Sequence, residues 1–164
     1  MKLAVGLNAT TLPPDGCVAT IGNFDGVHRG HRQVIERLAT EGQRLGLPTC
    51  IVLFEPQPRE FFDPANAPPR LMRLRDKIDR LSELPVDYVL ILRFNRTLAG
   101  MPPDAFIEDI LIRALKVRYL VIGDDFRFGR KREGDFKLLV ETGRRCGFEV
   151  ADTQTVLAGS DRIS

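Results

Sequence analysis

Cysteine is scarce in the sequence, and no apolar run approaches the ~20 residues that a helix needs to cross a bilayer. Cys17, Cys50 and Cys146 lie far apart, and no pair has the CxxC spacing typical of metal and redox sites. The N-terminal stretch also has too short an apolar segment for a secretory signal. We therefore expect a cytoplasmic protein whose three cysteines are buried, reduced thiols.

An excess of charge of one sign is also missing. The 164 residues carry a formal net charge of +2, which gives no reason to expect a nucleic-acid or membrane partner. The hydrophobic share of 43% and the charged share of 28% are typical of a globular protein. We expect residues 1–164 to form a single domain, without internal repeats or low-complexity segments.

Apolar runs that are typical of strands alternate along the chain with helical patterns. The strand-like runs lie at 17–24, 49–54, 86–92, 117–122 and 148–156, and the helical patterns at 31–45, 71–84, 104–115 and 136–146. Nearly continuous Val, Ile and Leu is typical of parallel strands that are buried on both faces. The alternation predicts a doubly wound α/β fold, a mostly parallel five-stranded sheet with helices on both faces, with one long irregular loop at 55–69.

The turn after the first strand contains both histidines of the chain, His28 and His31. Ligands of such sheets bind beyond the carboxyl ends of the strands, where this turn lies. Residues three apart share one face of a helix, so both imidazoles can donate hydrogen bonds to a phosphate, and can carry positive charge if their pKa is raised. Gly26 permits a positive φ, and Gly30 allows a ligand to approach the free N–H groups of the first helical turn.

The familiar phosphate loops, GxGxxG and GxxxxGK[ST], do not occur in this turn. A phosphate site without an invading lysine favours nucleotidyl transfer over transfer of a γ-phosphoryl group. Two alternatives remain open at this point. His28, His31 and Asp25 could bind a metal, although no cysteine joins them, or the two histidines could cap the helix.

The turn and four later stretches together resemble one known family. The turn reads TIGNFDGVHRGH and contains an HxGH motif, and the later stretches read FEPQPREFF, PPRLMRLRDKIDRL, RFNRTLAGMPPDAFIEDIL and VIGDDFRFGRKREGDF. They resemble the N-terminal FMN adenylyltransferase domain of the bacterial bifunctional riboflavin kinase/FAD synthetases, in the HxGH nucleotidylyltransferase superfamily. The resemblance implies a Rossmann-like fold and the reaction of FMN with Mg²⁺-ATP to give FAD and pyrophosphate.

Residues and resemblance together predict an ATP site. His28 and His31 would be the catalytic residues, in contact with the triphosphate. The predicted ATP-binding set is Gly22, Asn23, Phe24, Asp25, Gly26, His28, Gly30, His31, Gly123, Arg127, Arg162 and Ser164. Mg²⁺ would be carried largely by the nucleotide, and no residue is assigned to it.

A flavin site is predicted from the loops after the other strands. Proline-stiffened backbone and flat phenylalanine rings suit an isoalloxazine ring, although Phe61 and Phe62 fit the core equally well. The predicted FMN-binding set is Pro56, Pro58, Phe62, Asn95, Asp125, Phe126 and Phe128, and it is the resemblance to the family that favours Pro56, Pro58 and Phe62. Within it, Phe126 and Phe128 are expected to sandwich a ring.

Several assignments in these loops have alternatives. Asn95 could equally cap the short helix that begins at Thr97. In the basic run after the fourth strand, Arg127 could steer a phosphate, whereas Lys131 and Arg132 are expected to be solvated.

The last residues, DRIS, contain only the beginning of an ISSTxxR-like segment that covers the ATP phosphates in the family. The riboflavin kinase domain of the full-length family protein is not expected in this chain, so riboflavin phosphorylation is not expected and adenylylation is expected to be weakened. A fragment that binds nucleotide or flavin without turnover, and a nucleotidylyltransferase with a non-flavin acceptor, remain alternatives.

Overall fold

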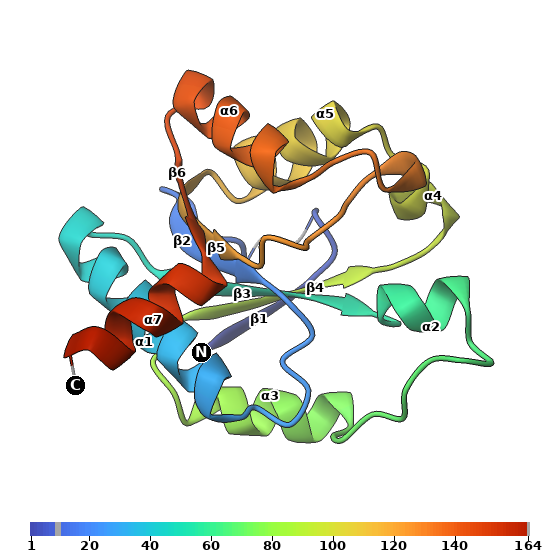
Figure 1. Cartoon of the computed structure of the whole chain (residues 1–164), viewed down its shortest axis with the longest axis horizontal. Coiled ribbons are helices and arrows are strands. Elements are labelled where there is room, and N and C mark those ends of the chain that lie inside the picture. The colour runs from blue at the N-terminus through green and yellow to red at the C-terminus, as the bar shows by residue number, and fades with distance from the viewer. Residues whose placement is uncertain (9–10, 164) are drawn as a thin grey trace.

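The fold is a six-stranded parallel sheet with helices on both faces (Figure 1). The computed structural model describes residues 1–8 and 11–163, without the side chains of 159–163. The strands are β1 (Lys2–Val5), β2 (Cys17–Ile21), β3 (Thr49–Glu55), β4 (Tyr88–Arg93), β5 (Val117–Ile122) and β6 (Glu149–Asp152). Their order is β1-β4-β3-β2-β5-β6, and each neighbouring pair is parallel. The predicted α/β class is confirmed, with one strand more than the five expected.

The helices form two layers, one on each face of the sheet (Figure 1). One layer contains α1 (Arg29–Leu45), α3 (Leu74–Ser82) and α7 (Thr153–Ile163). The other contains α4 (Arg96–Ala99), α5 (Pro103–Phe106), the π-helix η1 (Ile107–Ala114) and α6 (Phe136–Cys146). Two short helices, α2 (Pro58–Phe62) and the 3₁₀-helix η2 (Arg130–Arg132), lie in the loops that follow β3 and β5.

Neighbouring residues of the central strands face opposite helix layers. On β2, Val18 packs in the cluster that contains Leu38 of α1 and Leu81 of α3. Ala19 instead packs in the cluster that contains Ile110 of η1. All five of these side chains are fully buried, which is why the strands read as nearly continuous apolar runs.

Several element boundaries differ from the sequence-based prediction: β2 ends at Ile21 instead of residue 24, and α3 spans Leu74–Ser82 instead of 71–84. β1 was missed because it has only four residues at the edge of the sheet and exposes Val5 to 70%. β6 ends at Asp152 instead of continuing to Val156, because the Asp152 carboxylate accepts a hydrogen bond from the Gln154 N–H at 2.9 Å and turns the chain into α7. The expected long loop at 55–69 contains α2.

The thiols agree only partly with expectation. Cys17 and Cys50 are free and buried, and the Cys17 Sγ donates a hydrogen bond to the Leu115 carbonyl at 3.4 Å. Hydrogen bonding to Cys50 and burial together raise the pKa of the Cys17 thiol. Cys146 is exposed at the end of α6, so the expectation that it is buried was wrong. Across residues 1–8 and 11–163, each helix is too short or too polar to span a bilayer.

Candidate active site

The site lies where the order of the strands reverses. β2 is followed by α1 in one helix layer, and the loop after the neighbouring β5 leads to α6 in the other layer. Loops that diverge in this way leave a crevice at the carboxyl ends of the strands, where doubly wound folds bind ligands. The two histidines follow β2 directly at this edge.

The segment from residue 22 to residue 31, here called the phosphate turn, has an unusual backbone. Gly26 has a φ of 81°, as predicted, but Phe24 and Val27 also have positive φ values of 51° and 44°. Such values are costly for residues with side chains and persist only where the surroundings impose them. Here burial imposes them, because Phe24 is only 4% exposed and Val27 only 2%.

The two histidines cap helix α1 and hold each other. The His28 Nδ1 accepts hydrogen bonds from the backbone N–H groups of Gly30 at 3.1 Å and His31 at 3.4 Å. In return, the His31 Nδ1 accepts from the His28 N–H at 3.1 Å. Their rings stack with centroids 3.6 Å apart, and the His31 ring also lies 4.7 Å from the ring of buried Phe24. The capping alternative and the shared face are therefore both confirmed.

This arrangement fixes where the imidazole protons are. Since Nδ1 accepts a hydrogen bond in both His28 and His31, the proton that each ring can donate to a ligand is on Nε2. Burial, together with the charges of His28 and Lys77, lowers the pKa of His31 to about 4, although Asp25 acts in the opposite direction. The possibility that a raised pKa makes this histidine cationic is thus excluded, and His31 is an uncharged hydrogen-bond donor.

We expect His31 to stay neutral down to about pH 5, because its pKa of about 4 lies below the usual 6.5. Between these two values the unfolded chain binds more protons than the folded one, so the contribution of His31 to stability decreases as the pH falls. NMR titration of the imidazole signals measures the pKa directly. A midpoint near 6.5 for His31 would contradict the capped, neutral arrangement.

Three glycines of the predicted ATP-binding set make room for a neighbouring side chain. A Cβ on Gly30 would lie 3.1 Å from the His28 ring, and one on Gly22 would lie 3.2 Å from the Phe24 ring. A Cβ on Gly123 would lie 2.7 Å from a carboxylate oxygen of Asp125. The N–H groups of Gly30 and His31, expected to be free for an anion, are already bonded to His28. ATP contacts at these glycines stay predictions.

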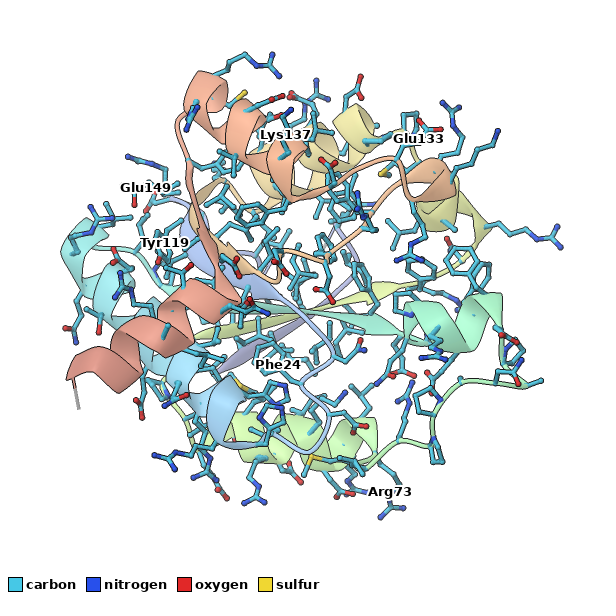
Figure 2. All side chains as sticks on the ribbon, in the orientation of Figure 1. Phe24, Arg73, Tyr119, Glu133, Lys137 and Glu149 are labelled. Atoms are coloured by element: carbon cyan, nitrogen blue, oxygen red, sulfur yellow. The ribbon has the colours of Figure 1, made fainter. Side chains whose placement is uncertain are left out.

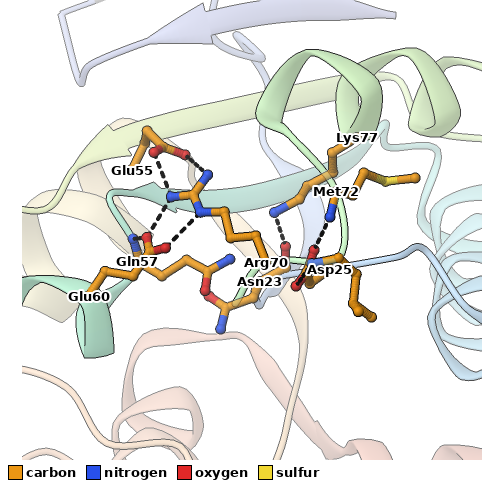
Figure 3. Close-up of polar contacts among 9 residues, drawn as sticks. Asn23, Asp25, Glu55, Gln57, Glu60, Arg70, Met72 and Lys77 are labelled. Carbon is orange, nitrogen blue, oxygen red and sulfur yellow. Dashed lines mark hydrogen bonds and ion pairs between the residues drawn. The ribbon is translucent and has the colours of Figure 1, made fainter. Parts of the chain in front are cut away.

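Two further residues of the phosphate turn make hydrogen bonds outside it, Asp25 to the segment before α3 and Asn23 to α3 itself. The carboxylate oxygens of Asp25 accept hydrogen bonds from the backbone N–H groups of Leu71 at 2.8 Å and Met72 at 3.0 Å (Figure 3). The Asn23 carbonyl accepts a hydrogen bond from the Lys77 Nζ at 2.6 Å. Phe24 points away from solvent, between the sheet and α3 (Figure 2). A metal-binding role of Asp25 is therefore not supported, because its carboxylate is already engaged.

A cavity of about 440 Å³, here called the aromatic cavity, lies among the loops that follow β3, β4 and β5. Its walls are mostly apolar, and its rim carries three arginines. The lining residues are Phe54, Pro58, Arg59, Phe62, Phe94, Leu98, Ala99, Phe106, Phe126, Arg127, Phe128, Gly129 and Arg132. A cavity of this size with flat aromatic walls suits a planar ring system.

The aromatic cavity contains part of the predicted flavin set. Pro58, Phe62, Phe126 and Phe128 line it. Phe126 and Phe128 do not sandwich a ring, because they stack on each other with centroids 5.6 Å apart and an interplanar angle of 19°. Phe128 is only 5% exposed and also packs on Phe106, so these two rings form one wall.

The other predicted flavin residues lie elsewhere in the part of the chain that the structure describes. Asn95 caps α4, with its Oδ1 accepting from the Leu98 N–H at 3.0 Å, so the capping alternative is confirmed. Asp125 turns its carboxylate back over Gly123. Pro56 follows β3 but is not part of the cavity wall.

Three arginines lie at the rim of the aromatic cavity. Arg127 lines the cavity and pairs with Asp135 at 3.4 Å, and its predicted ATP contact stays a prediction. Arg132 is exposed, as expected, and also lines the cavity, as does Arg59, which the sequence-based prediction did not include. The sequence did contain an indication that Arg59 belongs to this site, since Arg59 directly follows Pro58 in the predicted flavin loop.

Arg70 connects the aromatic cavity to the phosphate turn. Its guanidinium bonds both oxygens of Glu55, at the end of β3, at 2.6 and 3.0 Å, and both oxygens of Glu60 in α2 (Figure 3). These bonds lower the pKa of Glu60 to about 2. The next residue, Leu71, is bonded to Asp25, so α2 and the phosphate turn are held by one continuous segment.

The predicted ATP contacts of the C-terminal residues lie outside what the structure describes. The side chain of Arg162 and the whole of Ser164 belong to this part of the chain. Among the residues whose side chains are described, no group of three or more His, Cys, Asp or Glu side chains could together hold a metal ion.

Comparison with known proteins identifies the family. A family model described as FAD synthetase matches residues 11–164. The bifunctional riboflavin kinase/FMN adenylyltransferase of Escherichia coli strain K12 is 52% identical over 165 residues, which cover 100% of this chain and 53% of that protein. The protein of the same name from Haemophilus influenzae is 48% identical, with 100% and 53% covered. The chain thus spans about half the length of the curated relatives it matches.

A solved structure shares the fold. The crystal structure of a macrolide-efflux protein from Streptococcus pneumoniae has a TM-score of 0.73 and 20% identity, over 93% of this chain and 51% of that one. At this identity the likeness concerns the fold alone. The family match includes the phosphate turn, the residues that line the aromatic cavity, and Arg70. Because the match covers residues 11–164, the chain belongs to the FAD synthetase family.

Proposed function

We propose that this chain transfers the adenylyl group of ATP to FMN, giving FAD and pyrophosphate. The observation that carries the proposal is the pair of stacked histidines at the switch edge, held in one framework with an aromatic cavity whose rim is cationic. The relatives named as FMN adenylyltransferases support the same reaction. Their riboflavin kinase half belongs to those longer proteins, in which these residues would be the adenylyltransferase domain.

In this reaction an oxygen of the FMN phosphate attacks the α-phosphorus of ATP. A new P–O bond forms as the bond between the α-phosphorus and the bridging oxygen breaks, and pyrophosphate leaves with the electron pair. No covalent intermediate with the protein is required, so catalysis consists of positioning and of stabilising developing charge. His28 and His31 would donate hydrogen bonds from Nε2 to the phosphate oxygens as negative charge moves onto pyrophosphate.

The acceptor would lie in the aromatic cavity. Its isoalloxazine ring would pack between Phe62 of α2 and the wall formed by Phe126 and Phe128. Arg59 and Arg132 on the rim would balance the charge of the FMN phosphate. A polar acceptor without a ring system would leave the apolar walls without a partner, so the cavity favours flavin over such acceptors.

Mg²⁺ would arrive with ATP. Mg²⁺ commonly binds through substrate phosphates with few protein ligands, so the nucleotide would supply most of its coordination. When bound, it would neutralise charge on the triphosphate. We propose a cytoplasmic location, in line with the free, buried thiols of Cys17 and Cys50.

The test is formation of FAD from FMN, ATP and magnesium, followed by chromatography with flavin fluorescence detection. We expect FAD and pyrophosphate to form in equal amounts, and FMN fluorescence to be quenched on binding. Quenching without FAD would mean that residues 1–164 bind flavin without turnover. No quenching by FMN at millimolar concentration would refute the flavin acceptor.

A further inference from the structure

Lys77 is a buried lysine that the proposed mechanism does not use. It lies on α3, is only 2% exposed, and extends its ammonium to the Asn23 carbonyl in the phosphate turn at 2.6 Å (Figure 3). The two residues are 54 positions apart in the chain. Burying an ammonium group is costly unless a partner compensates its charge, so the position of Lys77 requires an explanation.

The carboxylates near Lys77 are all engaged elsewhere. Both oxygens of Asp25 accept backbone N–H groups, and Glu55 and Glu60 are each bonded through both oxygens to Arg70. Among the described residues, no carboxylate oxygen lies within the 4.0 Å of the Lys77 Nζ that defines an ion pair. The ammonium therefore has one backbone carbonyl as its hydrogen-bond partner and no direct counter-ion.

The phosphate turn carries one cationic side chain of its own, Arg29, which is exposed to solvent. Both histidines offer Nε2 as a donor because their Nδ1 atoms accept hydrogen bonds, and its lowered pKa keeps His31 uncharged. An uncharged donor positions a phosphate but supplies little attraction for a species with several negative charges. A buried positive charge, which water screens less than that of Arg29, contacts the turn at Asn23, on Lys77.

We propose that Lys77 is a positioning residue of the nucleotide site, which holds the phosphate turn through Asn23 and supplies the positive charge that attracts the triphosphate. The inference rests on the proposed nucleotide site. The negative charge of the triphosphate would attract the Lys77 ammonium across the turn, where little water screens the interaction. The charge of Lys77 also contributes to the low pKa of His31, together with burial and His28, so it helps to keep that donor neutral.

The first test compares three variants by calorimetric binding of inorganic pyrophosphate and of ATP. We expect Lys77→Met to weaken both affinities at least ~10-fold, which corresponds to about 1.4 kcal/mol, and Lys77→Arg to stay within about 3-fold of the original. Lys116→Met is a matched control, since the Lys116 Nζ also donates to a backbone carbonyl, that of Pro14, at 2.8 Å. Unchanged pyrophosphate affinity in a folded Lys77→Met protein would overturn the proposal.

A second readout separates charge from packing. In Lys77→Met the pKa of His31, measured by NMR, should rise from about 4, whereas Lys116→Met should leave it unchanged. FMN quenching should change little in either variant, because Lys77 does not line the aromatic cavity. An equal loss of FMN and pyrophosphate binding would mean that Lys77 supports the fold in general, and would also overturn the proposal.

If Lys77→Met does not fold, the unaltered protein decides the question. With lysine labelled at Nζ, pyrophosphate should shift the Lys77 signal, assigned through Lys77→Arg, and leave the Lys116 signal in place. No shift at saturating pyrophosphate would overturn the inference. Pyrophosphate binding that depends on Lys77 in a protein that forms no FAD would instead refute the proposed function and leave the role of Lys77 intact.

Discussion

Replacing His28 with asparagine should lower the rate of FAD formation about 100-fold, the usual effect of removing one preorganised donor to developing charge. Asparagine is among the best helix N-caps, so its Oδ1 can replace the Nδ1 that accepts from Gly30 and His31. Its amide Nδ2 donor is one bond closer to the backbone than the imidazole Nε2, so it does not reach the position of the Nε2–H that is proposed to contact phosphate. The variant therefore removes the catalytic donor and keeps the cap.

The comparison with His28→Ala tests this separation. Alanine removes both the donor and the cap, and loss of an N-cap costs about 1 kcal/mol of stability. Initial rates of FAD formation and thermal unfolding should be measured on both variants. We expect equal losses of rate, with a lowered melting temperature only in the alanine variant. An asparagine variant with undiminished rate would show that His28 is a cap and nothing more.

The second large effect is expected at the rim of the aromatic cavity. Phe62 is 60% exposed, although it lines the cavity and belongs to a cluster with Phe61 and Phe94. An exposed ring in this position is available for a flavin to cover. Complete burial of an aromatic side chain contributes about 1.5–3 kcal/mol to the binding free energy, and partial burial contributes roughly 10-fold in affinity. Phe62→Ala should raise the KM for FMN by about that factor and leave the KM for ATP unchanged.

Phe61→Ala provides the matched control for this variant. It removes the same ring from the same helix, but Phe61 is not part of the cavity wall. Steady-state kinetics with FMN and ATP varied in turn should show an effect on FMN only for Phe62→Ala. If the KM for ATP rises equally, or if both alanine variants behave alike, the Phe62 ring supports α2 instead of binding substrate.

The fold was predictable where local chemistry and burial agree. Helix α6 begins and ends where expected, because Asp135 caps its first turn through the Leu138 N–H and Gly147 ends it in a left-handed conformation. Strand β1 was not predictable, since its pairing with β4 is a contact between residues 86 positions apart, and three of its four residues are exposed. Edge strands carry little of the burial pattern that identifies central ones.

The candidate site was predictable in its place but not in its contacts. The position of the HxGH turn after β2 follows from the alternation of strands and helices. That Gly22, Gly30 and Gly123 make room for neighbouring side chains depends on rotamers, which spacing does not reveal. The stacking of Phe126 on Phe128 is missed for the same reason.

Lys77 is the residue for which a signal was present and unused. The buried side of α3 repeats at Leu74, Lys77, Ile78 and Leu81, so a lysine occupies a position where the helical pattern calls for an apolar residue. A charge in an apolar stripe indicates a specific partner. The partner, the carbonyl of Asn23, could be found only from the tertiary structure.

The reciprocal capping of His28 and His31 has a consequence for conformational entropy. Each Nδ1 bond fixes the rotation of an imidazole ring, so both Nε2–H vectors have their directions before any nucleotide arrives. A mobile side chain loses rotamer entropy when it binds a ligand, at a free-energy cost of up to about 1.5–2 kcal/mol for the most flexible side chains. The two histidines lose this entropy earlier, when α1 folds. The same hydrogen bonds that start a helix thus reduce the reorganisation that accompanies the chemical step.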